Sequence, residues 1–529
     1  MSAAAPASLW RVRDVTRRAP TGVLAPALLV AALVVSPLVF LALEAAATGP
    51  HTLSVLVFRS FTAQLLWNTV RLTAAATASC AVVGTGAAWL VERTDLPLRR
   101  VLGVVLVIPL AIPDFVVSFG WSSLSPALTG FWGALLVMTL AVYPLVYLPA
   151  AASFRQSDPA TEEVARSLGS GPWRTFWRVS LGQARAAILG GALLCALVLL
   201  AEYGAFEILG YQTFTTEVFT ELGVSFDLSG ASALALVLVA LSLLCVLAEV
   251  ATRGRARTHR SATLAPRPPQ RHALGRWRPL AGAGAGALAV AAVGVPVGTC
   301  IFWMVRATRV PLSGTSLWTA TGETALYGLA AGVLATLLAA PVALLAVRHP
   351  GRVSAVVERA TYLVLAVPGI VVALALTSFS LRDLGGFLYQ SPPLLVVAYA
   401  VLFFPLALVG VRTSLAQAPP GLEEAARSLG TGRIAVLGRV TLPLVAPGLA
   451  ASFSLVFLSV VTELTATLLL IPTGGATLAT QFWAYETNLS YTQAAPYALA
   501  MIVLAAIPSV ALSRYFDRLA RRRATPSAS

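Results

Sequence analysis

The stretch EEVARSLGSG, Glu162–Gly171, returns as EEAARSLGTG at Glu423–Gly432. Only 11% of the 529 residues are charged, so this polar stretch, kept in two copies, differs sharply from its surroundings. The chain is 57% hydrophobic with a mean hydropathy of +0.81, whereas a soluble protein is roughly 25% charged. The composition therefore predicts a membrane protein in which both copies are polar connections between apolar segments.

Apolar stretches long enough to cross a bilayer, about 20 residues each, recur along the whole chain. We expect twelve spans, at 23–47, 64–91, 101–121, 131–154, 184–205, 229–251, 279–305, 318–347, 355–379, 391–411, 443–471 and 492–514. The fold class that follows is an all-α polytopic membrane protein with about 12 transmembrane helices.

The arginines predict how these spans are oriented. The sequence contains no lysine, so arginine supplies all 37 basic residues. With the N-terminus inside, nearly all of them lie on the cytoplasmic side, where positive charge collects in membrane proteins. The exceptions are Arg59, Arg71, Arg306, Arg309 and Arg382. Both termini and both polar copies are then cytoplasmic, and the net charge of +15 reflects topology in a lipid bilayer rather than a nucleic-acid partner.

The repeat extends beyond the polar copies. Three further pairs mark it: Pro113 with Pro368, Pro144 with Pro405, and Glu202 with Glu463. The sequence therefore predicts two parallel six-span halves, 1–251 and 279–529, joined by a flexible Arg- and Pro-rich cytoplasmic linker, 252–278. Halves of this kind pack about a pseudo-twofold axis along the membrane normal, with a path between them.

Each copy of the polar stretch has the pattern of a short capped helix. Asp158 suits the N-cap and Pro159 the first helical position. Gly169 is placed to end the helix in a left-handed conformation, and Gly430 occupies the same place in the second copy. An aromatic and basic segment follows the first copy. We expect a helix, a glycine turn and a second short helix in each half.

Three roles compete for this helix. It could anchor the loop on the membrane surface, dock a partner protein, or hold a catalytic carboxylate pair. No His, Cys or Lys stands near either copy to complete a catalytic site. Repetition at symmetric places favours two docking points over anchorage.

The second copy, with VTLP at Val440–Pro443, resembles the cytoplasmic "EAA" loop of ABC-importer permeases. That family pattern is E-A-A, three residues, G, and later an apolar residue followed by L-P. The second copy matches it through Glu424, Ala425, Ala426, Gly430, Leu442 and Pro443, and the first through Glu163, Ala165 and Gly169. The first copy departs at Val164 and at Gly182, which replaces the proline.

The resemblance covers nearly the whole chain and implies two fused type I importer permease domains. Their coupling loops would span about 157–182 and 418–443. Each loop would contain a coupling helix that sits in a groove of a separate ATP-binding-cassette ATPase, present in two copies. An extracytoplasmic binding protein would deliver the substrate. The residues expected in ATPase coupling are Glu162, Glu163, Ala165, Gly169, Glu423, Glu424, Ala425, Ala426, Gly430 and Pro443.

The same resemblance predicts a transport subunit of the inner membrane rather than an enzyme. ATP and Mg would be bound by the ATPase partner and no cofactor by this chain. The missing lysine agrees, because a P-loop places a lysine on the nucleotide phosphates. No metal site is expected. The cysteines lie in apolar runs without a CxxC pair and are expected to be small buried hydrophobes: Cys80, Cys195, Cys245 and Cys300.

Two acids inside predicted spans, Glu202 and Glu463, lie near the outer face at symmetric positions. Intramembrane acids indicate function, so they are candidates for a cation-attracting gate, with a helix-end or packing role as the alternative. The sequence around these two acids, with TFTT at 213–216 and ELTATLLL at 463–470, resembles that of permeases of the ferric-iron importer group. The outer loop 206–228 carries four acids and no arginine.

Ferric iron is therefore the expected cargo, with thiamine, polyamine, phosphonate or sulfate as alternatives within the class. A secondary transporter of the major-facilitator type also has twelve spans in two halves, but it does not use the repeated polar stretch. A membrane enzyme is a third and more distant class. Because the first copy has lost an alanine and the proline, we expect unequal ATPase contacts, with the 424–443 loop less tolerant of mutation.

Overall fold

The computed structural model describes residues 20–157, 159–225, 227–253, 271–306, 314–364, 367–382 and 385–524. Within these ranges every regular element is a helix, and the one β-type contact is an isolated bridge between Thr94 and His272. The all-α fold class is confirmed. The expected cap at Asp158, the N-terminal arginines, Arg309 and most of the linker lie outside the described residues.

The helices of the first half are α1 Thr21–Thr48, α2 Pro50–Val57, α3 Ser60–Arg93, α4 Arg99–Val105, η1 Ile108–Ala111, α5 Asp114–Ser122, α6 Gly130–Val142, α7 Pro144–Gln156, α8 Pro159–Ser167, α9 Pro172–Thr175, η2 Phe176–Ser180, α10 Leu181–Ala201, α11 Gly204–Ile208, α12 Phe214–Gly223 and α13 Leu228–Arg253. Those of the second half are η3 Gly275–Trp277, α14 Arg278–Ala289, η4 Val290–Gly294, α15 Val295–Arg306, α16 Gly314–Arg348, α17 Arg352–Leu363, α18 Gly369–Arg382, α19 Pro392–Leu402, α20 Phe404–Gln417, α21 Pro420–Ser428, α22 Arg433–Val436, η7 Leu437–Thr441, α23 Leu442–Val461, α24 Thr465–Leu470, α25 Leu478–Thr487 and α26 Tyr491–Ala524.

Eight helical segments in the described part of the chain are long and apolar enough to cross a membrane. Counting each of three bent helix pairs as one span raises the number to 11. The remaining predicted span, 355–379, is divided between α17 and α18. The expected number of about twelve membrane helices agrees with this structure.

Several expected straight spans are interrupted instead. The segment 99–111 meets α5 at 97°, with Pro113 at the junction, because proline lacks an amide hydrogen and its ring clashes with the preceding turn. Pro368 precedes α18 in the same way. The helices α10 and α23 end at Ala201 and Val461, short of the predicted 205 and 471. Glu202 and Glu463 therefore lie in helix breaks.

The two halves are interlocked. The first helix of the chain, α1, packs on α16, α17 and α18 of the second half, while α15 packs on α5 of the first half. Gly120 of α5 lies so close to α15 that an added Cβ would be 2.7 Å from the Pro296 Cα. Each of the two hydrophobic cores accordingly contains residues of both halves.

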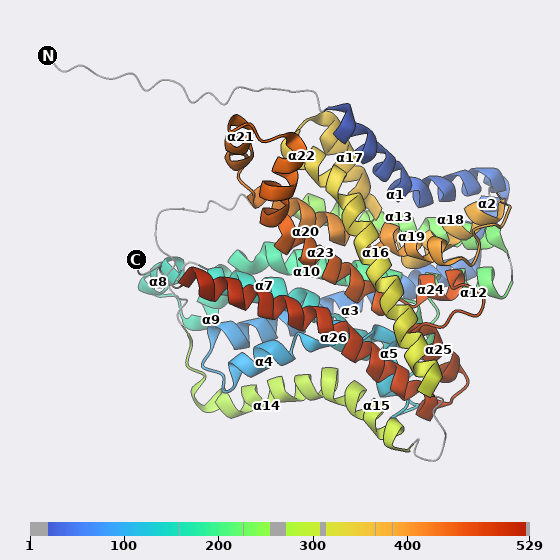
Figure 1. Cartoon of the computed structure of the whole chain (residues 1–529). Coiled ribbons are helices and arrows are strands. Elements are labelled where there is room, and N and C mark those ends of the chain that lie inside the picture. The colour runs from blue at the N-terminus through green and yellow to red at the C-terminus, as the bar shows by residue number, and fades with distance from the viewer. Residues whose placement is uncertain are drawn as a thin grey trace.

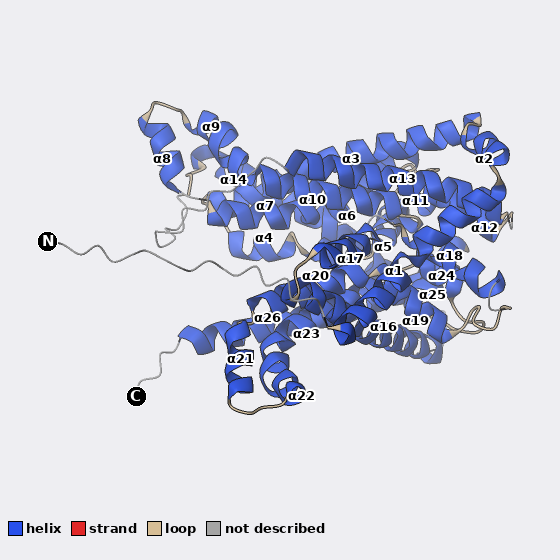
Figure 2. Ribbon diagram, turned by 90° about the horizontal axis from the view of Figure 1, so that it is seen from above, coloured by secondary structure: helices blue, strands red, loops and turns tan. Residues whose placement is uncertain are grey.

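The helices α8 and α21 protrude from the same end of the bundle (Figures 1 and 2). We refer to this as the loop end. The opposite end, which we refer to as the far end, carries α2, α12 and α25. The helix α3 begins beside α2 at the far end and leads towards α8 at the loop end, so it passes through the full length of the bundle.

Candidate functional site

The two polar copies fold into nearly identical loops at the loop end. In each, a nine-residue helix, α8 or α21, is followed by a turn, a four-residue helix, α9 or α22, and a five-residue π-helical segment, η2 or η7. The expected helix, glycine turn and second helix are thus present in both halves (Figure 2).

Glycine ends both protruding helices. Gly169 has φ = +81° and Gly430 has φ = +83°, a left-handed conformation that glycine adopts without steric cost. The Gly169 amide donates to the Arg166 carbonyl (2.9 Å), and the Gly430 amide to the Arg427 carbonyl (3.0 Å). These are the hydrogen bonds of a helix C-cap closed by a left-handed residue. The predicted caps are confirmed.

The paired glutamates of each copy have different environments. Glu162 is buried and forms an ion pair with Arg93, and the Ser180 hydroxyl donates to its Oε1 (2.8 Å). Glu423 pairs with Arg348 (2.9 Å) and accepts a hydrogen bond from the Thr441 hydroxyl (3.1 Å). Both carboxylates are therefore turned inward, to partners within the chain.

The other expected coupling residues are more accessible. Glu163 and Glu424 are exposed on α8 and α21. Of the small residues, Ala425 is exposed while Ala165 and Ala426 are half-buried. The remaining three, Gly169, Gly430 and Pro443, are exposed. Their roles towards a partner stay predictions, but their placement leaves them on the protruding surfaces.

Two apolar residues in these loops were missed from the sequence. Leu168 is 80% exposed and Leu429 is 85% exposed, each directly before the helix-ending glycine. An apolar side chain presented at the tip of a protruding helix indicates a contact surface when it is part of a larger patch. The signal was a large apolar residue kept at the same place in both polar copies.

The first loop has a contact that the second lacks among the described residues. The end of the linker returns to this loop, where His272 stacks on Trp89 and its Nδ1 lies 3.0 Å from the Arg166 Nη2. Backbone bonds join His272 to Arg93 and Asp95. Because arginine can only donate, the His272 Nδ1 must accept and therefore carries no proton in this contact.

This contact should weaken on acidification. Burial, followed by the Arg166 and Arg93 guanidiniums, lowers the pKa of His272 below its ordinary value, against a smaller opposing effect of Glu162. A lowered histidine pKa contributes stability above the unfolded-state value of about 6.5, and this is lost as the pH falls below it. We expect the protection factors of the His272 and Asp95 amides against hydrogen exchange, which correct for the intrinsic rate, to be lower at about pH 5.5 than at about pH 7.5. A His272→Gln variant, which cannot titrate, should abolish the additional pH dependence.

A cavity of about 450 Å³ lies between the halves and brings the two predicted gate acids together. Glu202 and Glu463 both line it, as does Asp114. The Ala205 amide donates to the Glu202 Oε1 (2.7 Å), and the Ala466 amide donates to the Glu463 Oε1 (2.9 Å). Each glutamate thus caps the N-terminus of a short helix, α11 or α24, and also lines the cavity. The gate and helix-end interpretations are compatible.

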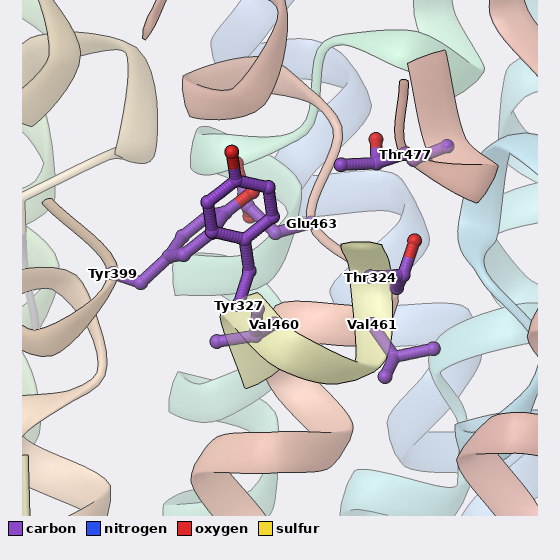
Figure 3. A pocket seen from close by; sticks show the side chains of 8 residues that line it. Thr324, Tyr327, Tyr399, Val460, Val461, Glu463 and Thr477 are labelled. Atoms are coloured by element: carbon purple, nitrogen blue, oxygen red, sulfur yellow. The ribbon is translucent and has the colours of Figure 1, made fainter. Parts of the chain in front are cut away.

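Asp114 is a third acid at this cavity that was not predicted from the sequence. It opens α5 directly after the break at Pro113, and the repeat places Gly369 at the equivalent position. A Cβ on Gly369 would lie 3.1 Å from the Glu463 Oε1, so in the second half the Glu463 side chain occupies the space beside this position. Figure 3 shows the Tyr327 and Tyr399 rings lying beside Glu463.

The remaining chemistry of the described residues is sparse. No group of three or more His, Cys, Asp or Glu side chains in the described ranges could hold a metal ion. All four cysteines are free; Cys80, Cys195 and Cys300 are buried as expected, and Cys245 is half-buried.

Comparison with known proteins adds to this geometry. Residues 81–254 and 331–525 each match the family described as "binding-protein-dependent transport system inner membrane component". A Fe(3+)-transport system permease protein of Haemophilus influenzae is 35% identical over 482 residues, covering 90% of this chain and 95% of that protein.

Other relatives cover one part of the chain. A molybdate/tungstate transport system permease protein of Thermococcus kodakarensis is 30% identical over 32% of this chain and 71% of its own length. A sulfate transport system permease protein of Escherichia coli is 30% identical over 31% of this chain and 66% of its own length. With two matched segments that contain the two protruding loops, the chain belongs to the family of binding-protein-dependent transport system inner membrane components.

Proposed function

We propose that this chain is the membrane-spanning subunit of an ATP-driven importer for ferric iron. An extracytoplasmic binding protein delivers the cargo, and a separate ATPase, which binds ATP and Mg, drives its passage. The chain lies in the inner membrane with both termini in the cytoplasm. Residues 1–251 and 279–529 are its two permease domains, and 252–278 connects them.

The observation that carries this proposal is the pair of matching loops at one end of the bundle. The helices α8 and α21 end in the same glycine-closed cap, and each presents an exposed glutamate and an exposed leucine, Glu163 with Leu168 and Glu424 with Leu429. Two similar surfaces suit two copies of one ATPase.

The cavity supports a cationic cargo. Three acids line it, and no arginine or histidine is among its described lining residues. A cavity whose charged lining residues all have the same sign, in a low-dielectric surrounding, concentrates ions of the opposite charge. The relatives named for molybdate and sulfate match about a third of this chain, whereas the relative named for Fe(3+) matches 90% of it.

The test is reconstitution of the chain in proteoliposomes with a candidate ATPase subunit and a candidate secreted ferric-iron-binding protein. Iron-loaded binding protein outside and ATP at the loop end should together give iron uptake. Molybdate, sulfate, thiamine or a polyamine in place of iron should give none. Uptake that persists without the ATPase under a proton gradient would instead support a major-facilitator transporter.

Removing charge from the cavity should slow iron uptake. In Glu202→Gln and Glu463→Gln the amide oxygen can still accept the capping hydrogen bond, so the fold is kept while one negative charge is lost. We expect a roughly tenfold lower uptake rate at low ionic strength, where focusing of cations is strongest, with ATPase binding unchanged.

The matched control is Glu323→Gln. Glu323 also caps a backbone amide, that of Ala476 (2.8 Å), but it does not line the 450 Å³ cavity. It should transport at the wild-type rate. Wild-type uptake by both cavity variants would show that these acids serve only as helix caps.

A further inference from the structure

An arginine closes the loop-end terminus of the longest helix in each half. Arg93 is the last residue of α3 and Arg348 the last of α16. The Arg93 side chain is 0% exposed and that of Arg348 is 14% exposed. The two positions are equivalent in the repeat, like Pro113 and Pro368. An arginine kept in both halves and largely shielded from solvent calls for a role of its own, because burial of an unpaired charge is strongly unfavourable.

In the first half this arginine joins the segments that form the root of the loop. The Arg93 Nη1 donates to the Ser157 hydroxyl (2.7 Å), two residues before the start of α8, and its Nη2 pairs with Glu162 inside α8. The Ser180 hydroxyl, at the end of η2, donates to the same carboxylate (2.8 Å). One guanidinium thus holds both the entry and, through Glu162, the exit of the loop.

The second half repeats the arrangement with different atoms. The Arg348 Nη2 donates to the Ala418 carbonyl (3.1 Å) and to Glu423 (2.9 Å). The Thr441 hydroxyl, at the end of η7, donates to the Glu423 Oε1 (3.1 Å). A backbone carbonyl replaces the Ser157 hydroxyl and threonine replaces serine, yet the same three points are joined. We refer to each set as a bracket, the first containing Arg93 and Glu162, the second Arg348 and Glu423.

A bracket of this kind makes the loop and the helix end move together. In the first bracket, separating the charges would leave each one buried without a counter-ion, which is far less favourable than moving the pair intact. In the second, Glu423 would keep Arg427 (3.2 Å), but Arg348 would lose its carboxylate partner. The bracket carboxylates belong to Glu162 and Glu423, whereas the neighbouring Glu163 and Glu424 are exposed. Holding the loop to the bundle and presenting it to a partner are therefore tasks of neighbouring residues.

The far end of each long helix holds a second symmetric contact. The Thr69 hydroxyl of α3 accepts the Phe214 amide (3.2 Å), and the Thr324 hydroxyl of α16 accepts the Leu478 amide (2.8 Å). Phe214 and Leu478 are the first residues of α12 and α25. These helices come directly after α11 and α24, the short helices that the two cavity glutamates cap.

The spacing of the two contacts is the same in both halves. Thr69 precedes Arg93, and Thr324 precedes Arg348, by the same number of residues. At 1.5 Å per residue this corresponds to about 36 Å of helix. A continuous helix of that length connects the loop root with the segment beyond the cavity acids.

From these contacts we infer that α3 and α16 are the transmission elements of the transporter. The brackets fix each loop to its long helix, and the threonine contacts connect that helix to the far-end segment. A displacement of α8 or α21 therefore reaches the far side of the path as a shift of one helix. Arg93, Glu162, Arg348 and Glu423 are positioning residues. This assignment rests on the proposed function, because it requires an ATPase that moves the loops.

The test uses the complete complex of permease, ATPase and binding protein in proteoliposomes. The double variant Glu162→Gln/Glu423→Gln removes the charge of both brackets. It should still bind the ATPase and hydrolyse ATP, but the iron transported per ATP should fall roughly tenfold, within the usual range of coupling between sites. Glu424→Gln, on the exposed surface, should weaken ATPase binding instead.

The second variant acts at the other end of the same helices. Thr69→Val/Thr324→Val keeps shape but removes both acceptors, and it should lower transport per ATP without touching the loops. Thr69→Ser/Thr324→Ser keeps the hydroxyls and should restore the wild-type ratio. This pair remains informative if the bracket variant fails to accumulate, because no charge is altered.

Glu92→Gln is the matched control at the loop end. Glu92 adjoins Arg93 on α3 and pairs with Arg155, whose side chain is 66% exposed, so its loss should leave the ratio unchanged. The inference is overturned if Glu162→Gln/Glu423→Gln weakens ATPase binding as much as Glu424→Gln, or if Thr69→Val/Thr324→Val transports normally per ATP. Failure of the proposed function would differ, since the wild-type complex itself would then show no ATP-dependent uptake.

Discussion

Gly430→Pro should abolish coupled transport while the protein still inserts and accumulates. Proline holds φ near −65°, whereas this position has φ = +83°. Proline also removes the amide that bonds to the Arg427 carbonyl at 3.0 Å. The helix α21 then cannot end in its left-handed turn, and α22 leaves it in a different direction. We expect uptake at least about tenfold lower, with ATP hydrolysis continuing.

The comparison for this variant is Gly421→Ala. Gly421 lies in the same helix, has an ordinary φ, and an added Cβ there would meet nothing within 4 Å, so transport should be retained. Gly169→Pro makes the equivalent change in the first loop, which has the extra contact with His272. We expect it to be the milder of the two. Normal uptake by Gly430→Pro would show that the turn is not needed.

Gly191→Leu should prevent the first half from folding. Gly191 lies where α10 crosses α7, and an added Cβ would be 2.5 Å from the Leu145 carbonyl oxygen and 2.7 Å from the Val146 Cα. Backbone atoms, unlike the end of a flexible side chain, cannot move away from the added atoms, so the two helices must separate. Overpacking typically costs about 1–3 kcal/mol and more where, as here, backbone atoms are in the way, and small residues at such crossings permit close helix packing in membranes.

The measurement is the yield of monodisperse protein in detergent and its thermal unfolding temperature. Gly182→Leu is the matched control, because Gly182 belongs to the same helix but has nothing within 4 Å of an added Cβ. It should behave as wild type. If Gly191→Leu gave the same yield and unfolding temperature, the α7–α10 crossing would have to be looser than its geometry shows.

Local structure could be predicted well from the sequence. The glycine-closed caps at Gly169 and Gly430 depend only on neighbouring residues, since no other residue adopts a left-handed turn at so little cost. Helix interruptions at Pro113 and Pro368 were equally local, although we expected continuous spans there. Proline ends or kinks a helix at its own position, so this effect needs no tertiary contact.

Side-chain orientation was much harder to predict. Adjacent glutamates in a short polar helix look alike in sequence, yet Glu162 is buried against Arg93 while Glu163 is exposed. Arg93 lies 69 residues away from its partner. In the sequence, Arg93 is only one of the many arginines whose distribution predicts the orientation of the spans. Only the packing of α3 against the loop root distinguishes it.

The sequence by itself determined the all-α membrane class, the tandem repeat and the two polar loops, because composition, apolar length and glycine and proline preferences act over short distances. Only the tertiary structure decided that α1 packs on the second half and α15 on the first, and that Asp114, Glu202 and Glu463 line one cavity. It also decided that each loop is tied to a long helix by an ion pair, which is buried in the first half and half-buried in the second. These features depend on contacts between residues that are far apart in the sequence. Packing and desolvation determine the energy of such contacts only once the chain is folded.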